Sequence, residues 1–153
     1  MDKKKPRRRR AEKRPAKKPK PFVRSDEPRA TDDDVELLEG RGSLKTGGGS
    51  GGHFWHVIFC GTKAGRAYIN YHENEAGEPR PSVTVMLNQQ SHGRGIGTIA
   101  FRRAAELSQY NEVYATVAKK NIASRNALER AGYVVAEEQK SSELYMVWRR
   151  DAG

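Results

Sequence analysis

The residues in this sequence whose spacing best suits ligand binding are three glycines at alternate positions, Gly93, Gly95 and Gly97. They follow a β-branched segment typical of a strand and precede apolar residues at helical spacing. Glycines at such a turn let successive main-chain N–H groups point into one concavity at the helix N-terminus. The helix dipole and Arg94 add positive charge there. The pattern indicates a phosphate-binding loop at His92–Gly97. A tight turn without a ligand has the same spacing.

Two common phosphate-binding loops can be compared with this segment. A P-loop ends in Gly-Lys followed by Ser or Thr, whereas Gly97 is followed by Thr98. A dinucleotide-binding loop has Gly-x-Gly-x-x-Gly spacing and an acidic residue about 20 positions further on. Here the spacing is Gly-x-Gly-x-Gly, and the next strand leads to Ala118 and two lysines. Both alternatives therefore fit poorly.

A second motif lies downstream, at residues 121–133. It contains an asparagine, a small residue three positions later, and a glycine–aromatic pair near its end. Segments 85–97 and 121–133 together resemble the two coenzyme-binding motifs of the GNAT N-acetyltransferases, the first of which is written Gln/Arg-x-x-Gly-x-Gly/Ala. The resemblance covers about residues 53–150. Two motifs at the right separation are far more specific than either one alone.

The resemblance implies a coenzyme site and a set of ligands. Acetyl-CoA would be the co-substrate, with its pantetheine arm in an opening between strands 83–87 and 113–117. The diphosphate would sit on the glycine loop, and an N–H near Leu87 or Asn88 would polarise the thioester carbonyl. No metal site is expected. The residues expected to bind the coenzyme are Leu87, Asn88, His92, Gly93, Arg94, Gly95, Ile96, Gly97, Thr98, Asn121 and Ser124.

Several positions depart from the family pattern. His92 stands where the motif has Gln or Arg, and histidine can still donate to a phosphate. Leu128 stands where many members have the tyrosine that protonates the leaving thiolate, so Ser124 or water becomes the proton source. Some branches, including those that resemble ribosomal-protein N-terminal acetyltransferases, also have an aliphatic residue at this position. No acidic residue lies on strand 83–87, so no catalytic base is assigned. The titratable residues nearest the end of the predicted hairpin are His72, Glu73, Glu75 and Glu78. Each of them suits a solvated turn better than the role of catalytic base.

The elements that must position these motifs alternate between strands and helices. Aromatic and β-branched segments predict strands, and apolar residues at helical spacing predict helices. Strands are predicted over 53–60, 65–71, 83–87, 113–117, 133–136 and 144–148, and helices over 96–107 and 124–131. With the resemblance, this order implies an α/β fold: a mixed, mostly antiparallel sheet with a central splayed strand pair and helices on its faces.

The region 31–52 is the least regular part before the expected domain. Residues 35–38 suit either a short strand or one helical turn after an Asp cap. Residues 40–52 contain seven of the fifteen glycines, a composition typical of flexible coil. The family's first helical region is therefore expected to be lost or shortened. Its loss would leave the acceptor site open, suited to a macromolecular amine or completed by the second subunit of a homodimer.

Basic charge is concentrated in residues 1–30. This segment has 14 Lys and Arg against 4 Asp and Glu, so it carries the whole net charge of +10. It also contains five of the seven prolines, and we expect a disordered tail. The tail is either a solvated appendage or a tether that binds nucleic acid or a ribosome through phosphate contacts.

Composition bounds the remaining possibilities. The length of 153 residues suits one domain, expected over 53–150. No stretch of about 18 apolar residues predicts a membrane span, and the N-terminus lacks the apolar segment of a secretory signal, so a cytoplasmic protein is expected. The single cysteine, Cys60, excludes an internal disulfide, and its apolar neighbours predict burial.

Two functions stay open on the sequence alone. The first is transfer of an acetyl group from acetyl-CoA to an amine on a protein or nucleic-acid-associated substrate. The alternative is a non-catalytic module of the same fold that binds nucleic acid or a ribosome through residues 1–30.

Overall fold

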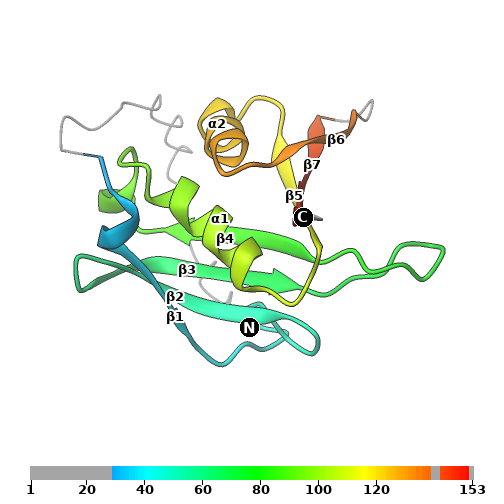
Figure 1. Ribbon diagram of the computed structural model, residues 1–153, viewed down its shortest axis with the longest axis horizontal. Coiled ribbons are helices and arrows are strands. Elements are labelled where there is room, and N and C mark those ends of the chain that lie inside the picture. The colour runs from blue at the N-terminus through cyan, green and yellow to red at the C-terminus, as the bar shows by residue number, and fades with distance from the viewer. Residues whose placement is uncertain (1–28, 139–141, 152–153) are drawn as a thin grey trace, which may run out of the picture.

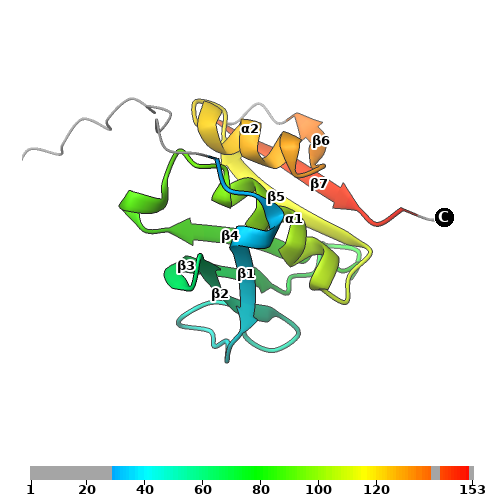
Figure 2. The same cartoon turned by 60° about the vertical axis from the view of Figure 1, so that its left-hand side comes forward.

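The computed structural model describes residues 29–138 and 142–151 (Figures 1 and 2). The predicted disordered tail falls almost wholly on residues 1–28, outside these ranges. Its last two residues are described, and Ala30 donates its N–H to the carbonyl oxygen of Arg94 at 2.8 Å. The end of the basic segment therefore lies against the glycine loop.

The described residues form one seven-stranded sheet in the order β1-β2-β3-β4-β5-β7-β6. Neighbouring strands are antiparallel except for β4 and β5, which are parallel. This confirms the mixed, mostly antiparallel sheet. The strands are β1 (Val35–Glu39), β2 (His53–Phe59), β3 (Thr62–Asn70), β4 (Ser82–Leu87), β5 (Glu112–Ala118), β6 (Val134–Glu138) and β7 (Glu143–Arg149).

Two α-helices contribute to one hydrophobic core with the sheet. α1 (Ile96–Leu107) follows β4 and α2 (Ile122–Arg130) follows β5 (Figure 1). Apolar residues of α1 at three- and four-residue spacing, such as Ile96 and Ala100, are buried, and alternate strand residues such as Val113 meet them. Among the described residues, neither helix is long and apolar enough to cross a bilayer.

The parallel pair β4 and β5 diverges along its length. Ser82 pairs with Tyr114, and the Tyr114 N–H donates to the carbonyl oxygen of Pro81 at 2.8 Å. No other residue pair joins these two strands, both of which are fully described. The predicted splayed pair is therefore confirmed, with its closed end at Ser82 (Figure 2).

Of the two structures that the sequence left open for residues 35–38, the strand is the one that forms. A 3-10 turn, η1 (Asp32–Asp34), is followed directly by β1. The Thr31 N–H and hydroxyl both donate to the Asp34 carboxylate, at 2.9 and 3.0 Å. On α1, Arg102 pairs with the Asp32 carboxylate, and Arg103 donates to the carbonyl oxygen of Asp32. The helix that follows the glycine loop thus anchors the start of the sheet.

The glycine-rich segment 40–52 is a loop with defined backbone contacts to itself and to the sheet. Ser43 and Gly47 exchange two backbone hydrogen bonds of 3.0 and 2.9 Å, and Gly47 and Gly48 are buried. A Cβ on Gly47 would lie 2.4 Å from the ring of Tyr68, so a residue without a Cβ is needed at this position. The segment contains no helix, in agreement with the expected loss of the first helical region.

The hairpin between β2 and β3 has a two-residue turn at Cys60 and Gly61. Both residues have positive φ, 47° and 80°, as such turns require. Cys60 is exposed, so the expectation of a buried cysteine is wrong. The reason is its place in the turn, where the chain leaves the packed part of the strand.

Candidate functional site

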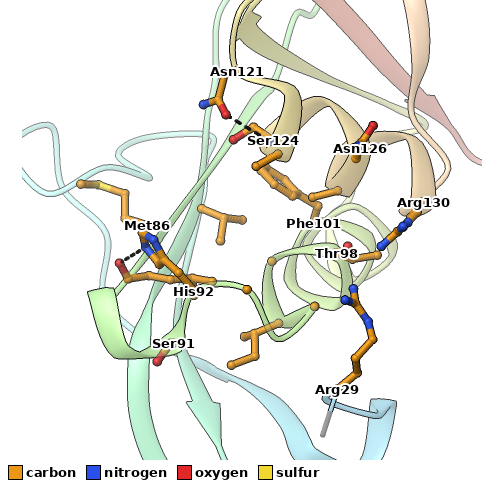
Figure 3. Close-up of a pocket in the computed structure, with 18 residues that line it drawn as sticks. Arg29, Met86, Ser91, His92, Thr98, Phe101, Asn121, Ser124, Asn126 and Arg130 are labelled. Atoms are coloured by element: carbon orange, nitrogen blue, oxygen red, sulfur yellow. Dashed lines mark hydrogen bonds between the residues drawn. The ribbon is translucent and has the colours of Figure 1, made fainter. Parts of the chain in front are cut away.

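A cavity of about 600 Å³ lies between the end of β4, the glycine loop, α1 and α2 (Figure 3). Its size is typical of small-molecule sites. It brings together all but two of the residues predicted to bind a coenzyme. The predicted residues on its lining are Leu87, His92, Gly93, Gly95, Ile96, Gly97, Thr98, Asn121 and Ser124.

The glycine loop has the backbone conformation that its composition predicts. Gly93 and Gly95 have φ angles of 78° and 82°, which residues with a Cβ rarely adopt. Gly95 is the N-cap of α1 and supplies no side-chain cap, so it leaves the first amides of the helix uncapped. A Cβ at Gly97 would have Leu87 Cδ1 as its nearest neighbour, 3.8 Å away. The loop therefore presents bare backbone to an open space.

His92 ties the loop back to the end of β4. Its Nε2–H donates to the carbonyl oxygen of Leu87 at 3.1 Å (Figure 3). This hydrogen bond fixes the ring tautomer, because a carbonyl only accepts. The ring is exposed and lines the cavity.

Main-chain groups of β4 face the opening toward β5. The Asn88 N–H donates to the carbonyl oxygen of Ala64 on the β3 side at 2.7 Å. Along an antiparallel ladder such pairs alternate, so the polar groups of Met86 also face β3 and those of Val85 and Leu87 face away from it. The β5 side lacks pairing beyond the closed end of these two strands. The N–H groups of Val85 and Leu87 are thus directed into the splay.

Asn88 and Arg94 are the two predicted ligands that do not line the cavity. The Asn88 side-chain amide donates to the carbonyl oxygen of Lys63 at 3.1 Å, which turns it toward β3. The Arg94 guanidinium lies over the ring of Phe59, 4.4 Å from its centroid. Contacts with Lys63 and Phe59, which the local motif does not specify, therefore direct both side chains away from the cavity.

The start of α2 forms the opposite wall. The side-chain oxygen of Asn121 accepts the N–H of Ser124 at 3.2 Å and caps the helix (Figure 3). Ser124 is partly buried on the lining, whereas Leu128 is only 1% exposed and packs in the core. The position that holds a tyrosine in many family members is therefore structural here.

The glycine–aromatic pair of the second motif is also structural. Gly132 has a φ of 97° and follows the end of α2. Tyr133 is 1% exposed, and its hydroxyl donates to the carbonyl oxygen of Phe101 at 3.0 Å. Burial raises the pKa of Tyr133 well above its usual range, so it stays neutral. This motif joins α2 to α1, and both helices line the cavity.

Sequence reasoning missed several lining residues, notably Arg29, Phe101, Asn126 and Arg130. Asn126 and Arg130 were detectable in principle, because they recur at helical spacing along the α2 wall. Arg29 carries no local signal, since it is one basic residue among many in residues 1–30. The lining contains two arginines and, among the described residues, no Asp or Glu. Its electrostatic potential therefore favours an anion.

Residues 13–134 match the family model described as the acetyltransferase (GNAT) domain. The match covers most of the chain, and the protein belongs to the GNAT acetyltransferase family. No curated protein matches the chain.

Several solved structures share this fold at low sequence identity. A putative GNAT-family acetyltransferase from Bordetella pertussis is 17% identical over 63% of this chain and 65% of its own, with a TM-score of 0.52. A putative acetyltransferase from Salmonella typhimurium, solved with its cofactor acetyl-CoA, is 15% identical over 67% of each chain, with a TM-score of 0.53. An aminoglycoside acetyltransferase in complex with coenzyme A is 18% identical over 65% of this chain and 67% of its own, with a TM-score of 0.54. The chain thus spans about two thirds of the length of these proteins.

Proposed function

We propose that this protein is an N-acetyltransferase that uses acetyl-CoA, bound in the cavity between β4, the glycine loop and α2. The observation that carries the proposal is the bare backbone of the glycine loop, which opens on a cavity lined by arginines but, among the described residues, no carboxylates. Family membership supports the same co-substrate. When bound, acetyl-CoA supplies the activated acetyl group.

The main chain does most of the binding in this proposal. The diphosphate sits on the amides of Gly93–Gly97, at the positive end of the α1 dipole. The amides of the pantetheine arm pair with β4 in the splay, as an added strand would. The N–H groups of Val85 and Leu87 face the thioester and replace Asn88, whose N–H is bonded to β3.

Proton transfer needs side chains, and Leu128 supplies none. Ser124 is the one hydroxyl on the α2 wall that lines the cavity, and we assign it, with water, as proton source for the leaving thiolate. The incoming ammonium must also lose a proton. A second cavity adjoins the closed end of the splay at Ser82 and Tyr114, and its lining includes His72 and Glu75. His72 and Glu75 are therefore the residues to test as the catalytic base that removes the proton of the ammonium.

The acceptor proposed is an amine on a macromolecule. No helix follows β1, and the loop 40–52 packs on the sheet instead, so the wall that would enclose a small acceptor is short. The aliphatic Leu128 and the Asn121–Ser124 pair favour the branch that resembles ribosomal-protein N-terminal acetyltransferases. A nucleic-acid or ribosome tether in residues 1–30 and a homodimer remain part of this proposal. Nothing in the described residues favours a non-catalytic module.

The decisive experiment is isothermal titration of the full chain with acetyl-CoA. Binding is expected in the micromolar range usual for such co-substrates. Release of free thiol is then measured with peptides that have a free α-amine, using the same peptides with a blocked α-amine as the control. Absence of acetyl-CoA binding rejects the proposal. Binding without turnover on any amine supports the non-catalytic alternative.

A further inference from the structure

The first described residue of the chain stands at the mouth of the glycine loop. Arg29 lines the cavity, and its Nη2 lies 3.0 Å from where a Cβ of Gly95 would be. Figure 3 shows its side chain pointing toward Thr98 and Arg130. Arg29 belongs to neither sequence motif and precedes the first strand.

Contacts on the C-terminal side of Arg29 hold its backbone in this place. Ala30 donates its N–H to the carbonyl oxygen of Arg94 within the glycine loop, at 2.8 Å. The capped turn that follows is bound to α1 through the ion pair of Asp32 with Arg102. The segment therefore runs along the loop and the helix, and the Arg29 side chain needs only to extend over Gly95.

The charges around this point suit a phosphate. Arg29 and Arg130 reach the same cavity from different elements and point toward one another across Thr98 (Figure 3). An anion bound between them would contact both guanidinium groups. The N-terminus of α1 adds positive potential at the same place. A guanidinium also offers paired donors that match two phosphate oxygens.

We propose that Arg29 is a ligand for the diphosphate of the bound coenzyme, and that Arg130 faces the same group from the α2 wall. This inference rests on the proposed function. The diphosphate is assigned, in preference to the 3′-phosphate, because Arg29 lies against Gly95, whose neighbouring amides open α1. The residue that joins the basic segment to the sheet thus completes the coenzyme site, and coenzyme binding holds that junction in place.

The test compares two arginine substitutions in the full chain by titration with acetyl-CoA. Arg29→Gln should weaken binding about tenfold, as expected for one charge-assisted contact at a partly exposed site. Arg41→Gln is the matched control, because it removes the same charge from an exposed position in the loop 40–52. The control should bind within about twofold of the wild type. Arg29→Lys should recover only part of the affinity, since it keeps the charge and loses the paired donors of the guanidinium.

A second ligand distinguishes the two kinds of phosphate. Acetyl-3′-dephospho-CoA retains the diphosphate, so Arg29→Gln should lose the same factor of about ten with it. Equal affinity of Arg29→Gln and wild type for acetyl-CoA would overturn the inference. A loss that disappears with the dephospho compound would overturn the assignment to the diphosphate. A lowered thermal midpoint of ligand-free Arg29→Gln would show a structural role and also overturn it. If the wild type itself fails to bind acetyl-CoA, the proposed function fails first.

Discussion

Two glycine-rich segments of this protein use glycine for opposite purposes. In the loop 40–52, absence of a side chain lets the backbone pack on the sheet, and a Cβ on Gly47 would lie 2.4 Å from the ring of Tyr68. In the loop 93–97, absence of a side chain leaves space, and a Cβ on Gly97 would meet nothing closer than 3.8 Å. The first segment packs on the sheet, and the second leaves backbone exposed at the cavity.

The comparison teaches that glycine content alone does not predict what surrounds a loop. Both segments contain glycines with positive φ, such as Gly47 at 102° and Gly95 at 82°. What differs is the neighbour in space: an aromatic ring for Gly47, and the Arg29 guanidinium at the edge of a cavity for Gly95. Substitutions in the two loops should therefore separate stability from binding.

The largest effect is expected from Gly95→Glu. A side chain and a negative charge at the N-cap of α1 would oppose the coenzyme phosphates, so acetyl-CoA affinity should fall at least about a hundredfold. Titration calorimetry measures the loss. Gly77→Glu is the matched control, because Gly77 also has positive φ, 76°, and no atom within 4 Å of a Cβ. Undiminished binding by Gly95→Glu would mean that this loop does not hold phosphate.

Gly47→Ala should affect folding and leave binding unchanged. The new methyl group would enter the Tyr68 ring at a positive φ, and the free energy of unfolding should fall by about 3 kcal/mol. Urea denaturation gives this value, and titration of the folded protein should give wild-type acetyl-CoA affinity. Gly77→Ala should cost only about 1 kcal/mol, because it adds the backbone strain without the clash. An equal loss of unfolding free energy in Gly47→Ala and Gly77→Ala would contradict the packing of the loop 40–52 against Tyr68.

Ser124→Ala tests the wall opposite the glycine loop. We expect the loop backbone to bind acetyl-CoA and Ser124 on α2 to donate the proton. In this variant kcat should therefore fall about tenfold, while the KM for acetyl-CoA stays within about twofold of the wild type. Steady-state kinetics with a responsive amine separate the two constants. An unchanged kcat would assign the proton to water alone. A raised KM with unchanged kcat would make Ser124 a binding residue.

The smallest effect concerns His53, which follows the first glycine-rich loop. Its ring stacks on Trp55 with centroids 5.3 Å apart, and Nε2 accepts the Gln109 N–H at 3.4 Å, so the neutral form fits. Burial lowers the pKa of His53, and the charge of Glu39 partly opposes this. Because the folded state disfavours the proton, stability should be full above about pH 6.5 and decline as the pH falls below it. Urea midpoints at about pH 5 and pH 7.5 should differ less in His53→Gln than in the wild type.

The sequence predicted the elements with strong local periodicity. The helix over 96–107 has the bounds expected, and the parallel splayed pair follows from the order of strands and the resemblance. The cavity also collects most of the predicted ligands, because the loop and the N-terminus of α2 carry local motifs. Asn88 and Arg94 do not line the cavity, because their side chains contact Lys63 and Phe59, which lie far away in sequence.

The sequence by itself determined the conformation of the glycine loop and the starts of the two helices, because φ freedom, helix periodicity and N-capping act within a few neighbouring residues. Only the tertiary structure decided which glycines are packed and which are open, since a ring or a cavity beside the backbone comes from distant strands. It also brought Arg29 to the loop. That contact depends on an ion pair between Asp32 and Arg102 and a backbone hydrogen bond between Ala30 and Arg94, which no local pattern encodes.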